Sequence, residues 1–65
     1  MTAADILSIC RENKGFTQKR LSEMTGIAIP NISQMENGRR KIGKMNAKKL
    51  TDALDCDAAD FFMYL

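Results

Sequence analysis

The chain has 65 residues, of which 45% are apolar and 28% are charged, and its formal net charge is +2. This length fits one small folded domain, residues 1–65, and excludes a large enclosed active site. The longest apolar run, residues 61–65, is too short to cross a bilayer, and the N-terminal residues lack the features of a signal peptide. We therefore expect a cytoplasmic protein with no membrane contact.

The residue types that are absent limit the possible chemistry. The sequence has no His, and its two cysteines are Cys10 and Cys56. Two cysteines without a histidine cannot complete a tetrahedral zinc site, and neither has a histidine to activate it as a nucleophile. We expect no enzyme activity, no catalytic residue, no metal, no cofactor and no small-molecule ligand. The cysteines are expected to be small buried residues in a reducing compartment; a redox-linked pair or a crosslink between chains is the alternative.

The charges are separated along the chain. Residues 37–50 contain six Lys or Arg residues and no acid, whereas residues 51–65 contain four Asp residues and no base. A concentrated basic stretch predicts a surface that binds a polyanion. An ordinary solvated helix face is the alternative interpretation of the same pattern.

Turn residues divide the chain into five predicted helices. The first covers about 3–13, with Thr2 as its N-cap and Gly15 just beyond its end. The second begins after Thr17, continues its inward face with Leu21 and Met24, and ends at Gly26. Ile6 and Cys10 are expected to face inward from the first helix, and Met24, Met35 and Met45 are expected to fill the core.

The third helix is predicted at about 29–37, followed by Gly38. Pro30 is tolerated there because it falls in the first turn, while Ala28 offers no side-chain oxygen at the N-cap. The fourth helix covers about 44–54, with an inward stripe of Ala47, Leu50, Ala53 and Leu54. A fifth begins at Asp57 and runs to about residue 65.

The most informative segment is residues 17–38. Two short helices are joined by residues 25–28, a turn too short to let them lie antiparallel. Gly26 allows the chain to reverse sharply, and Ile27 can fill the angle between the helices. This spacing predicts a helix-turn-helix that presents its second helix outward.

The motifs QKRLS at 18–22, GI at 26–27 and NISQMENGRR at 31–40 resemble the Cro/phage-repressor (XRE) helix-turn-helix family. The resemblance covers about residues 3–62. It implies an all-α, compact five-helix, lambda-repressor-like domain that binds double-stranded DNA as a dimer, with its third helix in the major groove.

The resemblance also implies roles for particular residues. The base-reading positions are Ile29, Pro30, Asn31, Ser33 and Gln34. The phosphate-contacting positions are Arg11, Gln18, Lys19, Asn37, Arg39, Arg40, Lys41 and Lys44. Arg11 and Glu36 match an internal ion pair that orients the arginine toward DNA in some relatives.

The start of the predicted third helix departs from the family pattern. Relatives often have a Ser or Thr at the position of Ala28 and polar readers where this chain has Ile29 and Pro30. Ile29 can contact a thymine methyl group but cannot hydrogen-bond a base, whereas Gln34 can make a bidentate contact with adenine. Direct readout is therefore expected mainly from Gln34, supported by Asn31 and Ser33.

These observations predict a sequence-specific transcriptional regulator, a repressor that binds an inverted-repeat operator as a homodimer. The apolar residues at the C-terminal end cannot all be buried by one helix face, so they predict the dimer interface: Phe61, Phe62, Met63, Tyr64 and Leu65. The alternative is an antitoxin-type module that binds a toxin protein and represses its own promoter.

Overall fold

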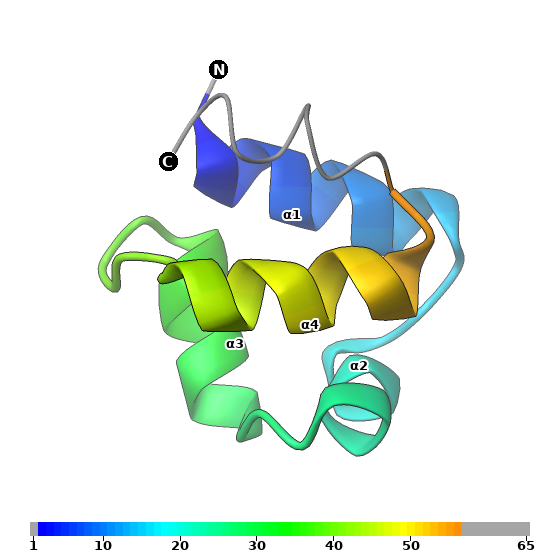
Figure 1. Ribbon diagram of the computed structural model, residues 1–65. Helices are drawn as coiled ribbons and strands as arrows, with labels where there is room; N and C mark the ends of the chain where they lie inside the picture. Colours follow the sequence, from blue (N-terminus) through cyan, green and yellow to red (C-terminus); the bar gives the residue numbers. More distant parts are fainter. Residues whose placement is uncertain (1, 57–65) are drawn as a thin grey trace.

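The computed structural model describes residues 2–56, which form four helices and no strand. The helices are α1 (Ala3–Asn13), α2 (Gln18–Thr25), α3 (Ile29–Glu36) and α4 (Lys44–Leu54). In Figure 1, α4 crosses the middle of the molecule below α1, α3 extends downward at the left and α2 lies at the lower right. The all-α class is confirmed, while the predicted fifth helix at 57–65 lies outside the described residues.

The helix ends follow from local hydrogen bonds. At the start of α1, the Thr2 hydroxyl accepts from the Asp5 amide at 3.3 Å, and the Asp5 carboxylate accepts from the Thr2 amide at 3.0 Å. Thr17 caps α2 by accepting from the Arg20 amide at 3.0 Å. The predicted N-caps Thr2 and Thr17 and the bounds of the first and fourth helices are therefore confirmed. α3 ends at Glu36, one residue before its predicted end.

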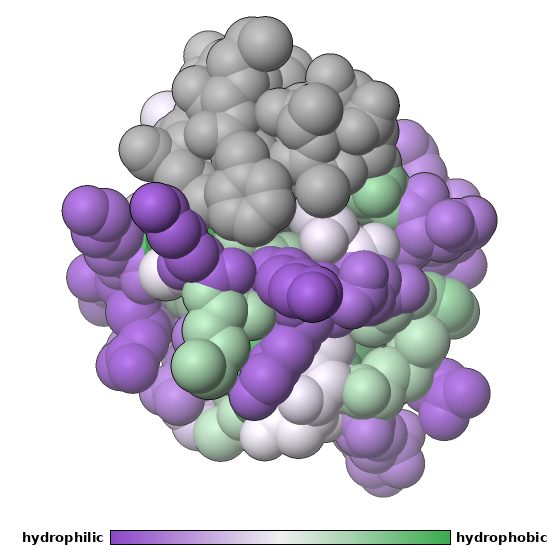
Figure 2. Space-filling model, in the orientation of Figure 1, coloured by the Kyte–Doolittle hydropathy of each residue, from purple (hydrophilic) through white to green (hydrophobic). Residues whose placement is uncertain are grey.

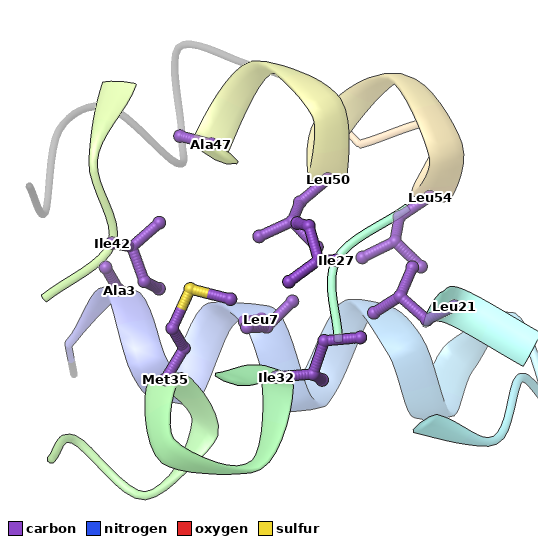
Figure 3. Packing of buried hydrophobic residues seen from close by; sticks show 10 residues of the cluster. All are labelled: Ala3, Leu7, Leu21, Ile27, Ile32, Met35, Ile42, Ala47, Leu50 and Leu54. Atoms are coloured by element: carbon purple, nitrogen blue, oxygen red, sulfur yellow. The ribbon is translucent and has the colours of Figure 1, made fainter. Parts of the chain in front are cut away.

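The core draws apolar side chains from every helix and from two connecting segments. Figure 3 shows them converging between the helices. The buried apolar residues are Ala3, Leu7, Leu21, Ile27, Ile32, Met35, Ile42, Ala47, Leu50 and Leu54. α2 packs against α3 and α4, and α1 packs against the same two helices. Because α3 is held from both sides, its orientation on the domain is fixed.

The structure corrects two expectations about the core. Met24 is 40% exposed and Met45 is 74% exposed, so only Met35 of the three predicted methionines fills the core. Met45 precedes the buried Ala47 by two positions, which places it about 200° around α4 on the solvent side. In α1, Leu7 is fully buried, and Ile6 and Cys10 face inward as predicted, half-buried against the core.

None of the helices within residues 2–56 combines the length and apolarity that crossing a bilayer requires.

Candidate nucleic-acid interface

The turn between α2 and α3 is built from three consecutive residues. Gly26 has φ +76°, a left-handed conformation that costs glycine little, and its amide donates to the Ser22 carbonyl at 2.8 Å. The Thr25 hydroxyl donates to the Leu21 carbonyl at 2.8 Å and accepts from the Ile27 amide at 3.2 Å. Ile27 is 7% exposed and inserts into the core. These contacts hold α2 and α3 in the predicted helix-turn-helix arrangement.

The start of α3 is apolar, as the sequence indicates. Ala28 occupies the N-cap without a side-chain hydrogen bond, and Pro30 lies in the first turn. The Ala28 carbonyl accepts from the Asn31 and Ile32 amides at 3.0 and 3.1 Å. The helix therefore begins on main-chain bonds alone, and the side chain of Ile29, which is 41% exposed, lies at its tip.

The outer face of α3 carries one long polar side chain. Ile32 and Met35 are fully buried, whereas Gln34, between them in sequence, is exposed. Asn31 and Ser33 are half-buried. Asn31 and Ser33 can hydrogen-bond a base but are less exposed than Gln34. Ile29 and Pro30 are exposed, but their side chains have no hydrogen-bonding group.

The loop after α3 is held by hydrogen bonds to the main chain of Gln34. Gly38 has φ +74° and turns the chain back, and the amides of Arg39 and Arg40 both donate to the carbonyl of Gln34, at 2.9 and 3.2 Å. The side chains of the predicted phosphate-contacting loop are exposed, as is the helix start that follows: Asn37, Arg39, Arg40, Lys41 and Lys44. Main-chain bonds thus hold the basic loop against the residue that the sequence predicts to read bases.

The basic residues continue onto a second exposed surface. Figure 2 shows hydrophilic side chains at the left edge, where Figure 1 places the loop before α4, and in a band across the position of α4. The exposed α4 residues include Lys48 and Lys49, with Asp52 beyond them. The cations of residues 37–50 are therefore solvated, which agrees with either a polyanion surface or an ordinary charged face.

A charged cluster joins α1 to the end of α3. Arg11 donates from Nε and Nη2 to the two carboxylate oxygens of Glu36 at 2.8 and 3.0 Å, and from Nη1 to the Phe16 carbonyl at 2.8 Å. The Arg11 and Glu36 side chains are 16% and 7% exposed. The hydrogen bond to Glu36 raises the pKa of Arg11, against the opposing effect of burial. The expected Arg11–Glu36 pair is present, and it holds the guanidinium within the protein.

Two further side chains complete this cluster. The Ser8 hydroxyl and the Gln18 amide nitrogen donate to Oε1 of Glu36 at 3.3 and 3.4 Å. Gln18 is half-buried, and the neighbouring Lys19 is exposed. Phosphate contacts by Arg11, Gln18 and Lys19 stay predictions. Arg11 and Gln18 already have hydrogen-bond partners inside the domain. Ser8 was not predicted, because nothing in its local sequence indicates that it faces α3.

The comparison with protein families decides the classification. A helix-turn-helix family model matches residues 7–61, which contain the whole of α2, the turn, α3 and the basic loop. The chain belongs to the Cro/C1-type helix-turn-helix family. It is a DNA-binding transcriptional regulator of this type.

A solved structure has the same fold as this regulator. It is the crystal structure of the clp gene regulator ClgR from C. glutamicum, with a TM-score of 0.86 and 24% sequence identity over 95% of this chain and 80% of that chain. No curated protein matches the sequence. Within residues 2–56 the regulator has no cluster of side chains suited to hold a metal ion.

Proposed function

We propose that this regulator represses transcription by binding an inverted-repeat operator as a homodimer, with Gln34 as its main base-reading residue. The observation that carries the proposal is the double role of Gln34. Its side chain is exposed on α3, and its carbonyl accepts the amides of Arg39 and Arg40. A base-reading group and a phosphate-binding loop are thereby held in one fixed register.

Two exposed side chains of α3, Ile29 and Gln34, match different chemical groups on the edge of a base pair. The Gln34 carboxamide both donates and accepts, so it matches the N6 and N7 edge of adenine in the major groove. Ile29 offers only an apolar surface and matches the C5-methyl group of thymine. We therefore propose half-sites in which A·T pairs lie beneath α3, with Asn31 and Ser33 in supporting positions.

The exposed cations supply affinity that does not depend on sequence. Arg39, Arg40, Lys41 and Lys44 follow α3 without an intervening acid. Contacts of such side chains with phosphates release counterions, so binding weakens as the salt concentration rises. Asn37, Gln18 and Lys19 are proposed to add phosphate contacts that fix the register of α3 on the duplex.

The role of Gln34 is tested by comparing selected and scrambled duplexes. A binding site is first selected from randomised duplexes, and wild type, Gln34→Ala and the exposed-amide control Asn13→Ala are titrated on both duplexes. We expect Gln34→Ala to weaken binding to the selected duplex roughly 5- to 150-fold, the value of one bidentate base contact. Binding to the scrambled duplex and both affinities of Asn13→Ala should stay unchanged. Equal losses on both duplexes would mean that Gln34 only positions the protein.

The role of Ile29 is tested by removing single methyl groups from the DNA. Replacing each thymine of the selected half-site by uracil should weaken wild-type binding at one or two positions and leave Ile29→Ala insensitive there. If wild type tolerates uracil at every position, Ile29 makes no methyl contact.

The homodimer is proposed from residues 61–65, which lie outside the described residues. Two-fold symmetry would place half-sites one helical turn apart, about 34–36 Å. Sedimentation at tens of micromolar, with and without the selected duplex, should give a dimer, and a monomer in both conditions would reject the homodimer.

Repression is tested with a reporter gene whose promoter contains the selected site. Expression of the reporter should fall when the regulator is present. A rise in expression would reject repression while leaving DNA binding intact.

A further inference from the structure

The two cysteines come from opposite ends of the sequence and meet at one end of the domain. Cys10 lies in the last turn of α1 and Cys56 follows the end of α4, and both are half-buried against the same core. Lys14 Nζ and Asp55 Oδ2 lie 3.8 Å apart, which independently shows that these helix ends adjoin. In Figure 1 the orange end of α4 lies beside the light-blue end of α1.

The position of Cys56 is set by its own main chain. Asp55 has φ +53° and ends α4, and the Cys56 amide then donates to the Thr51 carbonyl at 3.2 Å. The Cys56 Sγ lies 3.8 Å from the Leu54 carbonyl oxygen. Cys10 belongs to a regular helix. Both cysteines are therefore carried by ordered backbone at adjoining helix ends, and both are free thiols in the structure.

We propose that Cys10 and Cys56 form an oxidisable dithiol that closes an intramolecular disulfide between the end of α1 and the end of α4. The oxidant is a small disulfide such as glutathione disulfide. One protein thiolate attacks it, forming a mixed disulfide and releasing one reduced glutathione. The second protein thiolate then attacks the mixed disulfide and releases the other. The protein loses two electrons and two protons, and these reduce one glutathione disulfide to two glutathione molecules.

The environment of the pair sets how readily it reacts. Burial, together with the interaction with Cys10, raises the pKa of the Cys56 thiol to about 12. Because the thiolate is the reactive form, Cys56 is a slow nucleophile at neutral pH. Both thiols stay reduced in a reducing glutathione pool and are linked when the disulfide fraction rises.

The experiment measures the glutathione equilibrium of the protein when folded and when unfolded. Protein is incubated with defined mixtures of reduced and oxidised glutathione, in native buffer and in urea, and is then alkylated and digested with trypsin. Before digestion, the oxidised protein should have the mass of a single chain. After digestion, the expected product joins the peptide of residues 1–11 to that of residues 50–65. A native disulfide over a loop of this length typically makes folding between about tenfold and a thousandfold more favourable, so the folded chain should form it more readily by that factor.

Two further measurements separate this proposal from unspecific oxidation. The oxidised wild type should melt roughly 10 °C or more above the reduced protein, whereas Cys10→Ser and Cys56→Ser should show no such shift between the same conditions. Covalent dimers, glutathione adducts without the linked peptide, or an equilibrium no more favourable in the folded chain than in urea would each overturn the proposal. None of these results depends on DNA binding.

Discussion

Replacing Glu36 by alanine tests whether the charged cluster stabilises the fold. Glu36 accepts two hydrogen bonds from Arg11 and one each from Ser8 and Gln18, and its side chain is 7% exposed. The substitution removes all four bonds and leaves the Arg11 guanidinium charged, because arginine does not deprotonate in proteins. The C-terminal end of α3, which precedes the basic loop, would lose its hydrogen bonds to Arg11 of α1.

The magnitude follows from burial. Removing one partner of a buried ion pair costs about 3–5 kcal/mol. Arg11 is 16% exposed and keeps its bond to the Phe16 carbonyl, so we expect a value near the lower limit, about 3 kcal/mol. Small domains have about 0.05–0.15 kcal/mol of stability per residue, so this loss would be a large part of the total.

Urea unfolding followed by circular dichroism measures this loss. The matched control is the double variant Arg11→Met/Glu36→Met, which replaces the pair by two apolar side chains. It should lose less stability than Glu36→Ala, since it leaves no buried charge without a partner. A loss below about 1 kcal/mol for Glu36→Ala, the value of an exposed pair, would refute the reasoning.

Four other predictions concern the basic loop, Gly38 after the end of α3, the half-buried Cys56 thiol and the exposed surface. Arg40→Ala should weaken binding to selected and scrambled duplexes alike and lower the slope of log K against log salt by about 0.9, which titrations at several salt concentrations measure. Gly38→Ala should cost about 1–2 kcal/mol in urea unfolding, because φ is +74° although the added Cβ meets no atom within 4 Å, and Gly38→Asn should cost less. Raising the pH from 9 toward 12 should destabilise reduced wild type relative to Cys56→Ser by at most about 1.4 kcal/mol per pH unit, because the folded thiol, with its raised pKa, keeps a proton that the unfolded chain releases. Met45→Lys should change the free energy of unfolding by less than about 0.5 kcal/mol, since this side chain is 74% exposed.

Helix ends were predictable because single residue types determine them. A threonine oxygen can accept the amides of a first helical turn, as Thr2 and Thr17 do, and glycine most readily adopts the left-handed angles found at Gly15, Gly26 and Gly38. Periodicity also indicated the α4 stripe of Ala47, Leu50 and Leu54. These features depend on local geometry, which the sequence pattern carries directly.

The contacts that join distant segments were less accessible. Met24 was predicted to be buried, but its exposure depends on where α2 ends against its neighbours, which spacing within one helix does not determine. Ser8 meets Glu36 only because α1 crosses the end of α3. The bonds from Arg39 and Arg40 end on a main-chain carbonyl, and a carbonyl is present at every residue, so no residue type could indicate that Gln34 anchors the loop.

That anchoring has a consequence for how such a regulator can change its target. The loop is held by the carbonyl of residue 34, while the side chain of the same residue is exposed and takes no part in the two bonds. Any non-proline residue could occupy this position without removing the two main-chain hydrogen bonds that hold the basic loop. With Gln34 as the base-reading residue that we propose, single substitutions at residue 34 would change the preferred operator while the basic loop keeps its position. Under the same proposal, duplicated copies of the gene would diverge to separate operators through this position while the basic loop stays unchanged.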